Sequence, residues 1–129
     1  MDNRDVAREW FNIADADLLS AEFLQNMRPI PVEIICYHCQ QSAEKYLKGF
    51  LLFHGKTITR SHDLLILNRM CCTIDGSFEE IEEECLMLTD YSVTVRYPFH
   101  LDLDESDMKA ALKGAKKIKV FVSGKSSAT

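Results

Sequence analysis

A chain of 129 residues fits one domain and is long enough to close a single hydrophobic core. The hydrophobic share of 47% and the charged share of 27% are ordinary for a globular protein and exclude a disordered or fibrous chain, while the net charge of −5 argues against broad electrostatic capture of nucleic acid. No apolar run approaches the roughly 20 residues of a membrane span, and residues 1–8 lack the apolar stretch of a signal peptide, so we expect a cytoplasmic protein.

The first two predicted elements are long helices separated by prolines. Apolar residues recur at helical spacing from about residue 3 to residue 27. Pro29 and Pro31 end this helix and start the next, because proline lacks an amide donor and fits a first helical turn. The second helix is predicted over residues 32–54 and ends at Gly55.

The second helix has a mixed outer face. Ile34 and Leu52 lie there, away from the predicted core stripe, together with Gln41, Lys45 and Lys48. An apolar pair among polar residues suits a partner or a ligand better than plain solvent. We therefore expect a homodimer that forms through this face.

A short third helix is predicted over about residues 62–70, and the sequence Asp75-Gly76 then indicates a turn. Ser77 and Glu80 have the spacing of a capping box, which would open a fourth helix.

The fourth predicted helix extends to about residue 97, where Pro98 ends it. A fifth follows over about residues 105–122, with acidic residues at its start. No alternating strand pattern of useful length occurs. The fold class is therefore all-α, an up-and-down bundle of about five helices, four of them main and one short. We expect residues 1–124 to form the bundle and residues 125–129 a flexible tail.

The five cysteines are expected to be free thiols. Cys36 and Cys39 fall on the apolar stripe of their helix, whereas His38 points well away from it. Cys71 and Cys72 are adjacent, so a helix cannot easily bring both to one ion. A structural zinc ion needs four converging ligands, so the pattern favours core thiols over a metal site.

Positive charge gathers near the C-terminus, where two interpretations stay open. In the first, the lysines complement the dipole at the C-terminus of a helix and remain solvated. In the second, they form a binding patch. The first interpretation is favoured. The lysines concerned are Lys109, Lys113, Lys116, Lys117, Lys119 and Lys125.

Two charged residues break the apolar stripes. Asp17 lies in the middle of the first helix's stripe, and Arg96 falls on the inner face of the fourth helix. Burying such groups unpaired costs about 1–3 kcal/mol or more, so the two suggest either a charge-paired site or a purely structural ion pair.

Further polar residues lie near the ends of the third and fourth helices. His62 opens the third helix, where it would cap or pack. Tyr97 and His100 frame Pro98 just beyond Arg96. An arginine, a phenol and an imidazole at one loop can bind a phosphate, stack on a base and move a proton.

Several runs of residues resemble one known family, the HEPN domains. The run Tyr-His-Cys-Gln-Gln-Ser-Ala-Glu-Lys-Tyr-Leu-Lys at residues 37–48 is similar to the second helix of that family. The runs Ser-His-Asp-Leu at residues 61–64 and Val-Arg-Tyr-Pro at residues 95–98 match its third and fourth helices. Residues 10–24, with Asp17 among them, fit its opening helix, so the resemblance covers nearly the whole chain.

The resemblance implies a helical bundle, dimerisation, and association with nucleotides or RNA. Many prokaryotic members are encoded beside a minimal nucleotidyltransferase and act as the toxin of a toxin–antitoxin pair. Active members are metal-independent ribonucleases that use an arginine and a later histidine, brought together across a dimer cleft. Arg96 and His100 are separated by three residues, one fewer than that motif requires.

Three functions follow from this resemblance. The favoured one is a nucleotide- or RNA-binding component that acts with a minimal nucleotidyltransferase. The alternatives are a metal-independent endoribonuclease toxin and a non-catalytic interaction module. The catalytic residues would be Arg96 and His100, without metal or cofactor. The residues expected to bind nucleotide or RNA are Asp17, Lys45, Lys48, His62 and Tyr97.

Overall fold

The computed structural model describes residues 2–57, 60–94 and 102–126, and within these ranges every regular element is a helix. This confirms the all-α prediction. None of the described helices is long and apolar enough to cross a membrane.

The first two helices, α1 (Asn3–Leu24) and α2 (Val32–Phe53), match their predicted positions closely. The Asp2 carboxylate accepts a hydrogen bond from the backbone amide of Asp5 at 2.9 Å, which caps α1. Gly55 follows the end of α2 with a φ of 75°, a left-handed conformation that favours glycine and turns the chain away from the helix.

The third helix, α3 (Leu64–Cys72), begins later than predicted. The Asp63 carboxylate accepts a hydrogen bond from the amide of Leu65 at 2.9 Å, so Asp63 is the N-cap. The expectation that His62 opens this helix was therefore wrong. His62 lies in the connector before the cap.

The predicted fourth helix is broken into three pieces: the 3-10 helix η1 (Gly76–Ile81), α4 (Glu82–Leu88) and α5 (Tyr91–Thr94). The predicted capping box is also absent. The Asp75 carboxylate accepts a hydrogen bond from the backbone amide of Ser77 at 3.0 Å, so Asp75 is the cap. At the break between α4 and α5, the Thr89 hydroxyl oxygen accepts a hydrogen bond from the amide of Leu64 at 3.0 Å, which binds this turn to the start of α3.

The last helix, α6 (Glu105–Ser126), continues beyond its predicted end near residue 122. Its start is fixed by Asp104, whose carboxylate accepts hydrogen bonds from the amides of Ser106 at 2.9 Å and Asp107 at 3.0 Å.

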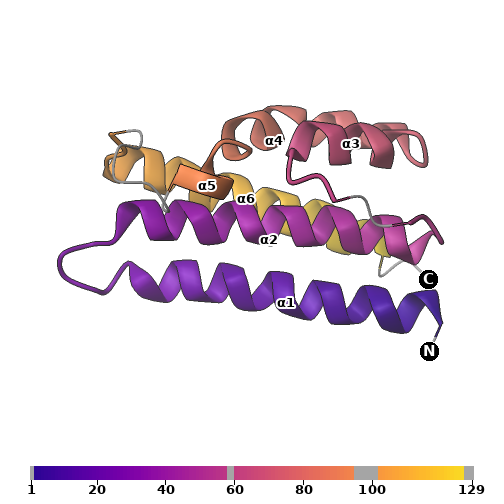
Figure 1. The fold of residues 1–129 in the computed structure, drawn as a ribbon, viewed down its shortest axis with the longest axis horizontal. Helices are drawn as coiled ribbons and strands as arrows, with labels where there is room; N and C mark the ends of the chain where they lie inside the picture. Colours follow the sequence, from indigo (N-terminus) through magenta and orange to yellow (C-terminus); the bar gives the residue numbers. More distant parts are fainter. Residues whose placement is uncertain (1, 58–59, 95–101, 127–129) are drawn as a thin grey trace.

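The helices form three layers (Figure 1). α1 lies antiparallel to α2 on one side, α2 and α6 form the middle, and α3 and α4 cover the other side. The α1–α2 turn, α5 and the start of α6 lie at one end of the molecule (Figure 1). The start of α1 and the end of α6 lie at the opposite end.

The core is closed by aromatic rings from separate elements. Phe78 of η1 packs on Phe50 of α2 with ring centroids 4.4 Å apart, and on Phe121 of α6 at 4.9 Å. The thiols of Cys36 and Cys39 are fully buried in the same core, as predicted. Burial raises the pKa of Cys36 to about 12, so this thiol stays protonated and packs as an apolar group.

Candidate functional site

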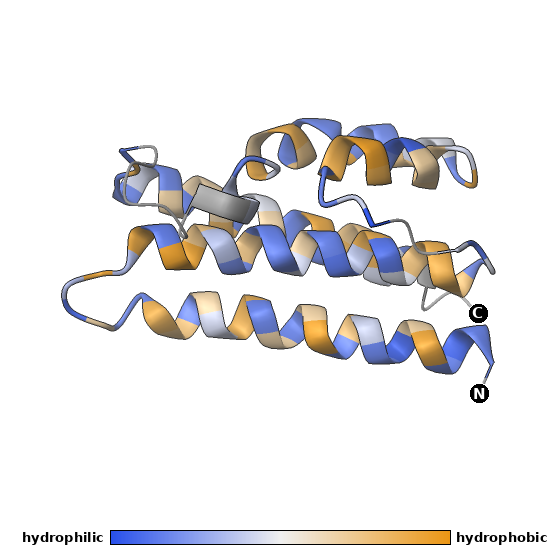
Figure 2. Cartoon of the chain, viewed as in Figure 1, coloured by the Kyte–Doolittle hydropathy of each residue, from blue (hydrophilic) through white to orange (hydrophobic). Residues whose placement is uncertain are grey.

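The middle turns of α2 are hydrophilic (Figure 2), although they lie inside the bundle's middle layer. Gln40, Glu44 and Lys48 follow one another at four-residue spacing, and each is at most 5% exposed. Because buried polar groups must find hydrogen-bond partners, these side chains are expected to form a defined network.

Glu44 is the centre of that network. Its carboxylate accepts hydrogen bonds from Gln40 Nε2 at 3.1 Å, Lys48 Nζ at 3.0 Å and His62 Nδ1 at 3.0 Å. The Glu44 side chain is only 5% exposed, whereas that of His62 is 67% exposed. The carboxylate thus holds the imidazole by Nδ1 and leaves Nε2 as the ring nitrogen that can meet a ligand.

The connector that carries His62 is fixed from the other side as well. Gln40 Nε2 donates to the backbone carbonyl of His62 at 3.2 Å, and the amide of Leu64 donates to Thr89. Thr89 lies two residues before α5, which packs against α2, and Tyr91 of α5 is buried. The start of α3, two residues after His62, is therefore hydrogen-bonded to the turn between α4 and α5.

A second group of polar side chains joins α1 to α2. The Asp17 carboxylate accepts a hydrogen bond from Lys45 Nζ at 2.6 Å and another from His38 Nδ1 at 3.0 Å. The side chain of Asp17 is 14% exposed, that of Lys45 is 21% exposed and that of His38 is 28% exposed. Asp17 turns inward as its helical phase predicts, and the partners that it meets are Lys45 and His38.

The two groups occupy neighbouring positions along α2. Gln41 Nε2 donates to Gln40 Oε1 at 2.7 Å, which adds Gln41 to the Glu44 network. We call the two groups together the polar band. It consists of Asp17, His38, Gln40, Gln41, Glu44, Lys45, Lys48 and His62.

Replacing Asp17 with alanine should lower the free energy of unfolding by about 1–3 kcal/mol, since Lys45 and His38 would lose a partly buried partner. Chemical denaturation measures the shift. Glu9→Ala is the matched control, because Glu9 lies exposed on the same helix and its loss should change stability by less than about 0.5 kcal/mol. Equal midpoints for the two variants would contradict the structural role of Asp17.

An exposed apolar surface adjoins the polar band. Leu19 and Phe23 of α1 are 64% and 75% exposed, Met27 in the connector after α1 is 53% exposed, and Ile34 of α2 is 42% exposed. A shallow groove of about 450 Å³ runs between Leu19, Phe23 and His38. The expected contact face therefore shifts toward α1, because Leu52 is partly buried. We call Leu19, Phe23, Met27 and Ile34 the apolar end surface.

The structure brings the predicted binding residues together in two pairs. Asp17 contacts Lys45 directly, and Lys48 shares the Glu44 carboxylate with His62. The predicted Arg96, Tyr97 and His100 lie outside the described residues.

The sequence did not predict four members of the site. His38, Gln40, Gln41 and Glu44 were not among the predicted binding residues, although Glu44 is the acceptor that organises the network. The available signal was the four-residue spacing of Gln40, Glu44 and Lys48, which places these three residues on one side of α2.

The lysines of α6 do not form a separate basic patch. Lys116 pairs with Glu22 at 3.6 Å, and Lys117 pairs with Glu84 at 3.0 Å. Lys119 and Lys125 also lie within ion-pair distance of carboxylates, those of Asp15 and Asp75. Intermixed charges of this kind weaken the attraction for a polyanion. Among the residues that the structure describes, no group of histidine, cysteine or carboxylate side chains could hold a metal ion.

The sequence and the structure were compared with known protein families and solved structures. The model of the HEPN domain matches residues 7–125. The structure of TT1696 from Thermus thermophilus is similar, with 25% identity, a TM-score of 0.74, and coverage of 92% of this chain and 97% of that one.

A second structure, ST0689, described as an archaeal HEPN homologue, has 24% identity and a TM-score of 0.74 over 93% of this chain and 97% of that one. No curated protein matches the sequence. Since the family model spans nearly all of the bundle, the chain belongs to the HEPN domain family.

Proposed function

We propose that this protein is a homodimeric component that binds a nucleotide or RNA and acts with a minimal nucleotidyltransferase. The observation that carries the proposal is the polar band, in which an exposed His62 is held by the buried Glu44 carboxylate. We expect Arg96 and Tyr97 to add a guanidinium and a phenol to this imidazole, so that one phosphate and its base can be bound.

The dimer would form through the apolar end surface. Four large apolar side chains, each 42–75% exposed, are more than a folded monomer normally leaves together on one face. His38 lines the same groove as Leu19 and Phe23, so a two-fold contact there would bring the polar bands of two copies next to each other. One ligand could then span both copies.

Replacing Phe23 with aspartate should convert the dimer to a monomer at tens of micromolar, because a symmetric contact would bury two new carboxylates. Light scattering reads the mass against the 14.8 kDa of one chain. Leu86→Asp is the control, since Leu86 is 58% exposed on α4 and lies outside this surface. A wild-type monomer under these conditions would rule out the proposed dimer.

Replacing Arg96 with alanine should weaken RNA or nucleotide binding by about 1.5–3 kcal/mol, because a guanidinium fork makes charge-assisted bonds to phosphate. Fluorescence anisotropy with labelled single-stranded RNA measures this change. Arg69→Ala serves as the control for general charge loss, because Arg69 is exposed on α3 and does not belong to the polar band. Equal losses for the two variants would point to nonspecific electrostatic binding.

A second candidate function is metal-independent RNA cleavage, with the protein acting as the toxin of a toxin–antitoxin pair. The specific observation in its favour is the Glu44–His62 contact, since a carboxylate on Nδ1 orients an imidazole for proton transfer through Nε2. In that reaction, a histidine would take the proton of a ribose 2′-hydroxyl that attacks the adjacent phosphate, while Arg96 stabilised the developing charge. The bond from phosphorus to the 5′-oxygen would break, leaving a 2′,3′-cyclic phosphate, and the 5′-oxygen would leave with a proton from a second histidine or from water. The short Arg96–His100 spacing favours binding over cleavage.

A further inference from the structure

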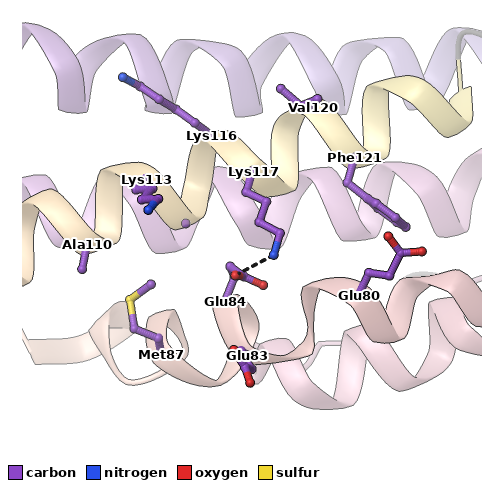
Figure 3. A pocket seen from close by; sticks show the side chains of 11 residues that line it. Glu80, Glu83, Glu84, Met87, Ala110, Lys113, Lys116, Lys117, Val120 and Phe121 are labelled. Atoms are coloured by element: carbon purple, nitrogen blue, oxygen red, sulfur yellow. Dashed lines mark hydrogen bonds and ion pairs between the residues drawn. The ribbon is translucent and has the colours of Figure 1, made fainter.

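A second hollow lies between α4 and α6 and shares no residue with the polar band. It is a groove of about 880 Å³, with η1 and α4 along one wall and α6 along the other (Figure 3). A groove of this size accommodates several side chains of a partner, and neither of the surfaces described above uses it.

The two walls carry opposite charges. Glu80 and Glu83 are exposed along the η1–α4 wall, and Lys113 is exposed along the α6 wall. Figure 3 shows the Glu84 carboxylate and the Lys117 ammonium meeting across the groove, at 3.0 Å. Glu80, Glu83 and Lys113 are exposed and therefore open to a partner of complementary charge.

The lining between the charged rims is apolar. Met87, Ala110 and Phe121 contribute to it, and Val120 stands 72% exposed at its edge. Gly114 leaves room for the Met87 side chain against α6, because an added Cβ would lie 2.7 Å from Met87 Cε. An apolar strip between charged rims is the pattern of an interaction surface, and a methionine can adjust its shape to a partner.

We propose that this groove binds an amphipathic helix of a partner protein. The apolar stripe of the helix would lie against Met87 and Phe121, its basic edge would face Glu80 and Glu83, and its acidic edge would face Lys113. A helix fits this surface because both walls are helices, which offer no open backbone edge for an added strand. The lining carries three glutamates and three lysines, and this balance of charge weakens the attraction for the phosphates of RNA.

Synthetic helical peptides test the proposal directly. Three peptides would share one leucine stripe and carry lysine on one edge with glutamate on the other, lysine on both edges, or glutamate on both edges. Reversing a helix in the groove exchanges its edges, so the mixed peptide can match the walls in one of the two directions. In fluorescence anisotropy with the full chain, it should bind at least about tenfold more tightly than either control. Equal binding, or preference for the all-lysine peptide, would overturn the proposal.

Protein variants locate the binding in the groove. The double substitution Glu80→Lys and Glu83→Lys, at exposed positions, should transfer the preference to the all-glutamate peptide. Val120→Asp should weaken the mixed peptide about tenfold, whereas Leu86→Asp, exposed on α4 outside the groove lining, should leave its binding unchanged. If the chain itself forms an oligomer that Val120→Asp dissociates, a second copy occupies the groove and the proposed partner helix is wrong.

Discussion

Replacing Glu44 with alanine should lower the free energy of unfolding by about 3–5 kcal/mol, because it leaves a buried lysine without its counter-ion. The Lys48 side chain is only 6% exposed, and its ammonium lies 3.0 Å from Glu44 Oε2. The same substitution removes one of the two acceptors of the Gln40 amide, and Gln40 is fully buried. Urea denaturation at neutral pH measures the change.

A second variant separates the buried charge from lost packing. When Glu44→Leu is combined with Lys48→Met, no unpaired charge remains, so the double variant should recover much of the stability that Glu44→Ala loses. Glu83→Ala is the matched surface control, since Glu83 is exposed on α4. A loss below about 1 kcal/mol for Glu44→Ala would mean that Lys48 reaches water and that the network is not buried.

Replacing Phe78 with alanine should cost about 3–5 kcal/mol, because it opens a cavity where three elements meet. The Phe78 side chain is fully buried, and its ring packs on Phe50 and Phe121. Phe23→Ala is the matched control, since Phe23 is 75% exposed in one chain. Its effect should be small in the monomer. Similar denaturation midpoints for the two variants would contradict the described core.

The main helices could be predicted because burial imposes a period of 3.6 residues on each long helix. The breaks in the fourth helix could not be predicted, because they are set by hydrogen bonds that the spacing of apolar residues does not reveal. The Asp75 carboxylate accepts a hydrogen bond from the Ser77 amide, and the Thr89 hydroxyl oxygen accepts one from the Leu64 amide in another part of the chain. His62 was misplaced for a similar reason, since the neighbouring Asp63 is the better cap.

The site shows the same limit. The helical spacing of α1 correctly predicted that Asp17 points inward. It could not predict which side chains of another helix would contact Asp17. Glu44 and Lys48 have the spacing of an ordinary solvent-exposed ion pair, and only the packing of α2 in the middle layer shows that they are buried. The predicted Arg96, Tyr97 and His100 lie outside the described residues, so their roles remain proposals.

The most direct test of the proposed function is incubation of labelled single-stranded RNA with excess protein in the presence of a metal chelator. Binding is followed by anisotropy, and the length of the RNA is then read on a denaturing gel. We predict saturable binding that Arg96→Ala weakens, with the RNA intact. Cleavage without metal that disappears in His100→Ala would instead make the protein a ribonuclease, since loss of a general acid or base slows such a reaction by about a hundredfold or more. Absence of any binding at tens of micromolar, for RNA and for free nucleotides alike, would contradict the proposed function.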